Sequence, residues 1–131
     1  MLALLFKVKY WIWIVTQYIW FYNTYIYILE PITYALLQEL RSFFNNPEAQ
    51  FTSPEQASAI NAVLNTKKDL LVVLPTGAGK TLVFLLPIFI MKKHVKRNMM
   101  TIVIVPLVAL AMDLKKRCEM SNITYTTWKG I

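Results

Sequence analysis

The segment from Leu70 to Thr81, LLVVLPTGAGKT, constrains this chain more than any other stretch. Five apolar residues and a proline precede TGAGKT, an order that predicts a buried strand, a tight loop and the first turn of a helix. In that geometry the loop amides and the positive end of the helix dipole converge on an anion, and glycines allow a close backbone approach. The segment therefore predicts a site for nucleotide phosphates, with the Lys80 ammonium on the phosphates and the Thr81 hydroxyl on Mg²⁺.

Six consecutive residues make up the predicted phosphate loop and its helix start. Each is a candidate for binding the nucleotide, and the last two are also catalytic candidates: Thr76, Gly77, Ala78, Gly79, Lys80 and Thr81. The strict pattern G-x-x-x-x-G-K-[ST] would place its first glycine at Leu74, so the chain misses that pattern by one residue.

The composition allows one modest core in 131 residues, 56% of them hydrophobic. The aromatic residues are unevenly spread, since three of the four tryptophans and five of the seven tyrosines precede Glu30. A formal charge of +7 suits a polyanionic partner and equally suits a solvated basic surface. The single cysteine, Cys118, excludes an internal disulfide framework and fits a reducing compartment.

Twenty uncharged residues, Tyr10 to Leu29, dominate the amino-terminal segment 1–30. This length suits a helix that crosses a bilayer, although the Trp, Tyr and Ile content is equally typical of strands. We expect an aromatic-rich hydrophobic segment that is helical or membrane-associated. Three interpretations stay open: a membrane anchor, a segment that packs on other parts of a larger protein, and translated sequence without a selected fold.

Helix signals follow this segment. Pro31 can open a helix that ends at Asn45-Asn46-Pro47, which makes residues 31–47 a predicted helical linker. Ser53 is a predicted N-cap, and Gln56 three residues later completes a capping box, so Gln56 already has a structural reason to be there.

Thr101 to Val105 form a β-branched run that predicts a strand buried on both faces, in the middle of a parallel sheet. A strand, helix, strand and helix in this order predict a right-handed crossover, with the loops after Pro75 and Pro106 at one edge of the sheet. Two basic runs, 92–97 and 115–117, end the two helices. Favourable charge at the helix ends explains them most simply, and contact with nucleic acid is the alternative.

Three segments together resemble the first three motifs of superfamily-two helicases, most closely the RecQ-like DNA helicases: FTSPEQ at 51–56, LPTGAGKT at 74–81 and VPLVALAMDL at 105–114. The missing first glycine is usual in that family. The resemblance implies that Gln56 reads the adenine edge and that Lys80 and Thr81 hold phosphate and Mg²⁺. It also implies that Pro106, Leu107 and neighbouring backbone amides contact the nucleic-acid backbone.

The fold class implied is α/β, an incomplete RecA-like P-loop domain with a parallel sheet over residues 48–131, of the DEAD/DEAH type. The implied cofactors are ATP and Mg²⁺, the partner is DNA with RNA as an alternative, and the location is the nucleus. Val105 and Leu114 depart from the serine and glutamine that RecQ-like proteins commonly carry, and the first departure removes one phosphate contact. No adjacent Asp-Glu pair occurs in the sequence. Because hydrolysis needs acidic residues and a second lobe, we expect the front piece of a helicase, truncated after the third motif and unable to hydrolyse ATP or unwind DNA by itself.

Two alternatives remain at this point. One is a fragment that binds nucleotide or DNA without turnover. The other is a different P-loop NTPase, such as a transporter ATPase or a small-molecule kinase, held at a membrane by Tyr10 to Leu29. The proline-leucine pair at 106–107 and the upstream glutamine argue against the second alternative.

Overall fold

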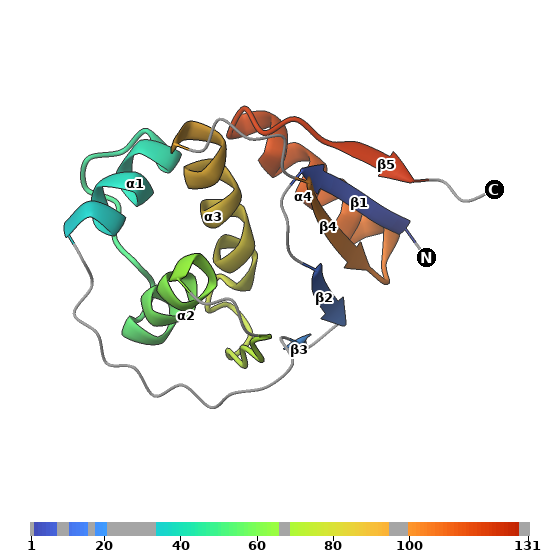
Figure 1. Ribbon diagram of the computed structural model, residues 1–131, viewed down its shortest axis with the longest axis horizontal. Helices are drawn as coiled ribbons and strands as arrows, with labels where there is room; N and C mark the ends of the chain where they lie inside the picture. Colours follow the sequence, from blue (N-terminus) through green and yellow to red (C-terminus); the bar gives the residue numbers. More distant parts are fainter. Residues whose placement is uncertain are drawn as a thin grey trace.

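The computed structural model describes residues 2–7, 11–15, 18–20, 34–65, 69–94 and 100–128 (Figure 1). The elements in chain order are β1 (Leu2–Lys7), β2 (Trp11–Val15), β3 (Tyr18–Trp20), α1 (Tyr34–Phe44), α2 (Pro54–Asn65), α3 (Lys80–His94), β4 (Met100–Val105), α4 (Val108–Met120) and β5 (Thr126–Trp128).

Strand β4 lies at the centre of a five-stranded sheet with the order β3-β2-β4-β1-β5. The predicted central position is therefore confirmed. Burial on both faces is met only in part, because Thr101, Val103 and Val105 are buried whereas the two isoleucines between them are half-buried. The sheet is mixed, however, and the predicted parallel sheet is wrong for the described strands. Only β2 runs parallel to β4, whereas β1 is antiparallel to both β4 and β5.

The amino-terminal segment supplies three of these strands. The helical form predicted for residues 1–30 is therefore wrong at 2–7, 11–15 and 18–20. Aromatic and β-branched residues fit a pleated surface, and the two edges of β4 offer unpaired backbone groups to such segments. The other residues of the segment 1–30 lie outside the part of the chain that the structure describes. Among the described helices, none has the length and apolar character needed to cross a bilayer.

The strand predicted at Leu70–Leu74 does not form, because Val72 alone in this segment makes an isolated bridge pairing. Burial still alternates with the period of a strand: Leu70 and Leu74 are buried, whereas Leu71 and Val73 are exposed. The residues 102–104 of β4 already pair with β1 on one side and with β2 on the other. The segment before the loop therefore packs one face on the core without the parallel pairing to β4 that the crossover predicts.

Helix α3 is the centre of the packing, and all side chains from Val83 to Ile88 are buried. Phe84 and Leu85 join the core beside β4 and α4, whereas Val83 and Leu86 join the core beside α1 and α2. Figure 1 shows α3 between these two groups of elements. A helix that is apolar all round must be buried on every side, and α3 continues from Lys80 to His94 through the buried Pro87.

Two helices end in the same way, with an asparagine in the left-handed region. Asn45 (φ 49°) follows α1 and Asn122 (φ 54°) follows α4. In each case the next amide donates back to a helix carbonyl, at 3.0 Å to Arg41 and 2.8 Å to Cys118, which is the pattern of a Schellman motif. The predicted end of the first helix at Asn45 is confirmed.

Candidate phosphate-binding site

The predicted tight loop turns directly into α3. The Ala78 amide donates to Pro75 O (3.2 Å), and the Leu82 amide donates to Gly79 O (3.0 Å) in the first turn of the helix. Gly77 (φ 84°) and Gly79 (φ 70°) both adopt the left-handed region, which L side chains rarely occupy. The two glycines therefore allow the loop to fold back on itself before the helix begins.

The surroundings of the two glycines differ. A Cβ on Gly77 would have no neighbouring atom within 4 Å, whereas a Cβ on Gly79 would overlap Gln56 Nε2. The backbone at Gly77 therefore faces open space from which a ligand can approach. At Gly79 the backbone instead faces the interior of the domain.

Gln56 fills that interior position, with 1% of its surface exposed. Its Oε1 accepts a hydrogen bond from the Thr52 amide (2.8 Å), and its Nε2 donates to Ala78 O (3.2 Å) and to Gly79 O (3.1 Å). This orientation of the amide follows from chemistry, because the reverse orientation would place an oxygen against two carbonyls and an NH₂ group against an N–H. Both Nε2 hydrogens are thus engaged by the phosphate loop.

The start of α2 holds this glutamine in place. Ser53 Oγ accepts from the Gln56 amide (3.2 Å), so the predicted N-cap is confirmed. The reciprocal bond of the capping box goes to the Thr52 amide instead of the Ser53 amide. Sequence analysis missed both the Thr52 contact and the tie to the loop. Ala78 and Gly79 lie 22 and 23 positions after Gln56 in the chain, and no local sequence pattern signals contacts over such separations.

The adenine contact implied for Gln56 stays a prediction. In the present arrangement the side chain is buried and its NH₂ group has no hydrogen left to donate to a base. Contact through this group therefore requires that the side chain release at least one loop carbonyl.

Lys80 and Thr81 occupy the first two positions of α3, and both are half-buried. The amino-terminal end of this 15-residue helix carries the positive end of its dipole. Backbone amides and an ammonium group are donors that suit a phosphate chain, and a hydroxyl oxygen can ligate the Mg²⁺ that travels with it. Within the described residues, no group of three or more His, Cys, Asp or Glu side chains could hold a metal ion.

Pro106 and Leu107 lie at the carboxyl end of β4, and Figure 1 shows β4 pointing toward the lower edge of the view, where α3 also begins. Leu107 is the N-cap of α4 and has no polar side chain to satisfy the first helix amides. The surface around it is apolar, with Leu107 57%, Val108 65% and Met112 65% exposed. The predicted nucleotide-binding residues, 76–81, and the predicted nucleic-acid contacts, Pro106 and Leu107, thus lie in separate turns, the first at the start of α3 and the second at the start of α4.

Several basic residues at the described helix ends have structural partners. Lys92 Nζ donates to Asn122 O (2.5 Å), Lys93 Nζ lies 3.0 Å from a Glu39 carboxylate oxygen, and Arg117 Nε lies 2.7 Å from Asp113 Oδ2. These contacts favour the structural interpretation of the basic runs. Residues 95–97 of the first run lie outside the described residues.

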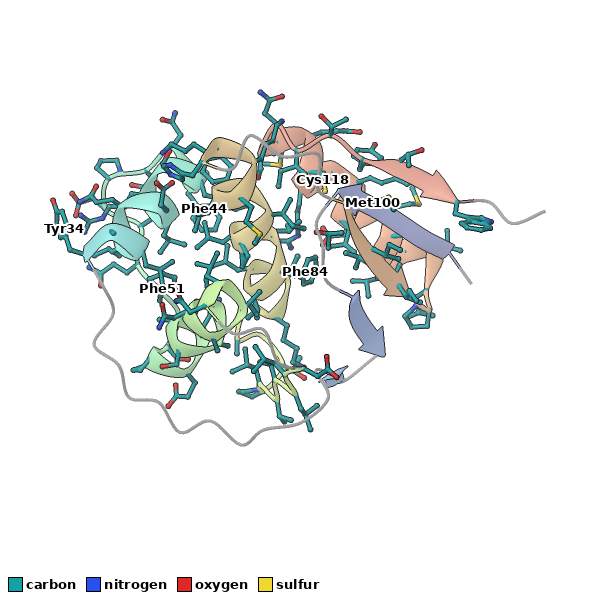
Figure 2. The ribbon with its side chains drawn as sticks, viewed as in Figure 1. Tyr34, Phe44, Phe51, Phe84, Met100 and Cys118 are labelled. Carbon is teal, nitrogen blue, oxygen red and sulfur yellow. The ribbon has the colours of Figure 1, made fainter. Side chains whose placement is uncertain are left out.

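The side chains of α3 contribute to both core clusters behind the loop, with Phe84 on the side of α3 that faces the sheet (Figure 2). A glycine loop with two left-handed residues that leads into a buried helix is the backbone arrangement typical of P-loop proteins. The chain belongs to the DEAD/DEAH box helicase family, which matches residues 53–129, more than half of the chain. This membership implies a RecA-like α/β fold and sets aside the alternative of a transporter ATPase or a small-molecule kinase.

Relatives with curated names support the RecQ-like resemblance. The chain is 46% identical over 63 residues to ATP-dependent DNA helicase Q5 of Rattus norvegicus. These 63 residues are 48% of this chain and 6% of that protein. It is 37% identical over 93 residues to ATP-dependent helicase SGS1 of Saccharomyces cerevisiae, covering 71% of this chain and 6% of that protein. A putative ATP-dependent DNA helicase Q1 of Caenorhabditis briggsae is 45% identical over 60 residues, which is 46% of this chain and 9% of that protein. The chain therefore spans less than a tenth of the length of these relatives, and the predicted resemblance to RecQ-like helicases is confirmed. No solved structure matches the chain.

Proposed function

We propose that this chain is the first part of the ATP-binding domain of a DNA helicase, and that it binds MgATP at residues 76–81. The observation that carries the proposal is the loop itself, which turns through Gly77 and Gly79 into the amino-terminal end of α3. Family membership supports this assignment, and the relatives' names supply the class of reaction.

In this proposal each part of the loop has a separate task. The loop amides and the dipole of α3 attract the phosphates, Lys80 adds a point charge to the outer phosphates, and the Thr81 hydroxyl ligates Mg²⁺. The metal ion, when bound with the nucleotide, neutralises charge on the phosphate oxygens. The nucleotide enters from the open side of the loop at Gly77, next to the exposed Thr76.

Nucleic acid is the proposed second ligand, with DNA the first choice, RNA the alternative and the nucleus the site of action. The uncapped first turn of α4, after Pro106 and Leu107, offers backbone amides to a phosphate group. The chain's charge of +7 favours a polyanion. Such binding must weaken as salt rises, because counterions are released when phosphates are neutralised.

We propose that the 131 residues bind nucleotide without hydrolysing it. Their sequence contains no adjacent Asp-Glu pair to hold the metal and orient water. Hydrolysis and unwinding then belong to the longer helicases to which the chain is related.

Titration calorimetry of the full chain with MgATP tests the nucleotide site. Lys80→Ala is expected to weaken MgATP binding at least about tenfold, because it removes a charge-assisted contact with the phosphates. Lys116→Ala is the matched control, since this lysine is exposed on α4, away from the loop, and should bind like the parent. Equal affinity of the parent and Lys80→Ala, or no binding by a folded parent, would contradict the proposal.

A further inference from the structure

Two successive carbonyl groups of the phosphate loop are held by one side chain. Gln56 Nε2 donates to Ala78 O at 3.2 Å and to Gly79 O at 3.1 Å. The second carbonyl also accepts the Leu82 amide at 3.0 Å, so it is held from the helix as well as from Gln56. The glutamine is itself fixed at its oxygen by the Thr52 amide.

These bonds determine where the neighbouring amides point. A trans peptide unit is planar, and its C=O and N–H point in opposite directions. Because the carbonyls of Ala78 and Gly79 face Gln56, the amides of Gly79 and Lys80 face away from it. In the proposed function, the phosphate chain lies on this side of the loop, opposite the glutamine.

We propose that Gln56 is a positioning residue for phosphate recognition, which aims the amides of Gly79 and Lys80 at the ligand by holding the two carbonyls behind them. The inference rests on the proposed nucleotide function and deepens it. It gives Gln56 a task that does not depend on the base, in contrast to the adenine contact implied by the family resemblance.

Burial and backbone conformation support this role. Gln56 is neutral and 1% exposed, and each of its polar atoms has a partner with the right polarity. Gly79 combines a positive φ with a Cβ direction that Gln56 already fills. The loop and the glutamine are therefore fitted to each other before any ligand arrives.

A ligand without a base distinguishes the positioning of the phosphate loop from contact with adenine. Calorimetry of the full chain compares Mg²⁺ complexes of ATP, GTP and inorganic tripolyphosphate, for the parent, Gln56→Ala and Gln56→Glu. Gln56→Glu keeps the size and the acceptor for Thr52 but turns an oxygen toward the two carbonyls. Both variants are expected to weaken tripolyphosphate binding about tenfold, and ATP and GTP binding at least as much, since two hydrogen bonds that orient the loop are lost.

Gln38→Ala is the matched control, because this glutamine is exposed on α1 and should leave all three affinities unchanged. A loss confined to ATP would overturn the proposal and assign Gln56 to the base alone. Unchanged tripolyphosphate affinity in a folded Gln56 variant would overturn it as well.

A measurement on the parent protein keeps the proposal testable if the variants do not fold. In ¹⁵N-resolved hydrogen exchange, the Gln56 NH₂ protons should exchange at least about tenfold more slowly than those of Gln38, before and after tripolyphosphate is added. Fast exchange of the Gln56 protons in either state would refute the positioning role. If the folded parent binds no ligand, the proposed function fails, whereas the exchange of the free protein still decides whether Gln56 holds the loop.

Discussion

Gln56 Nε2 occupies the position where a side chain on Gly79 would begin. The two residues are 23 positions apart, and the hydrogen bond from Nε2 to Gly79 O measures 3.1 Å. The second glycine of the loop therefore meets two requirements at once, a backbone conformation with φ at 70° and an absence of side-chain atoms beside Gln56. The first glycine, Gly77, meets only the conformational requirement.

Alanine substitutions should separate these two requirements. Gly77→Ala is expected to lower the free energy of unfolding by about 1 kcal/mol, because only the left-handed backbone is strained. Gly79→Ala should lower it by about 3 kcal/mol, since it also displaces Gln56 from its buried hydrogen bonds. Urea denaturation of both variants measures the difference. Equal midpoints for the two variants would show that Gln56 does not fill the space behind Gly79.

Glu39 on α1 joins this helix to the end of α3. Its carboxylate lies 2.7 Å from His94 Nε2 and 3.0 Å from Lys93 Nζ. Desolvation by burial raises the pKa of Glu39, but hydrogen bonds from His94 and Lys93, together with their charges, lower it more, and the net pKa lies below the ordinary 4.5. A carboxyl group with a lowered pKa stabilises the fold above its unfolded pKa and loses that contribution as the pH falls through its folded pKa.

Glu39→Gln should therefore be less stable than the parent at pH 7, by up to about 1 kcal/mol, because the side chains of Lys93 and His94 are partly exposed. The difference should shrink as the pH falls below 4.5. Thermal unfolding of both proteins between pH 3 and pH 7 provides the measurement, with Glu48→Gln as an exposed control. A stability difference that does not change over this range would argue against the ion pair.

Cys118 is buried in the core on α4, as Figure 2 shows. Burial, together with the nearby charge of Glu119, raises the pKa of its thiol from 9.0 to about 11. Because the thiolate is the reactive form, its population at pH 8 is about a hundredfold lower than for an ordinary thiol, and burial restricts access in addition. A thiol-specific chromogenic reagent should therefore react at least about a hundredfold faster in urea than in the native protein. Similar rates in the two states, after calibration against free cysteine in the same buffers, would contradict the buried position.

Leu86 tests whether α3 holds α1 and α2 together. Its side chain is 0% exposed and lies in the core cluster with Leu36, Leu40 and Ile60. Leu86→Ala is expected to lower the free energy of unfolding by about 3 kcal/mol, because it leaves a cavity that the surrounding helices fill only in part. Val108→Ala, at a position 65% exposed, should change stability by less than about 0.5 kcal/mol. A loss for Leu86→Ala no larger than that of the control would show that this core is not formed.

The local features of the site were predictable because they depend on neighbouring residues. TGAGKT marked the loop and the start of α3, Ser53 marked the start of α2, and Asn45 marked the end of α1. In each case a short-range hydrogen bond or a backbone preference decides the conformation, and the residues that make it are adjacent in the chain.

Strand partners were not predictable in this way. The run from Thr101 to Val105 indicated a central strand, but its β-branched residues favour any neighbour with a suitable edge. The pairing of β4 with β1 and β2, and the exclusion of Leu70–Leu74 from its two edges, arise from segments far apart in the chain.

The sequence by itself thus determined that this chain carries a phosphate loop at the start of a buried helix, since glycine conformation and helix capping act over a few residues. Only the tertiary structure decided which strands flank β4 and that Gln56 holds the loop from behind. Every residue type except proline has the same backbone donor and acceptor, so the choice of strand partner depends on the packing of the whole chain. The contact between Gln56 and the loop likewise exists only because α2 packs beside α3.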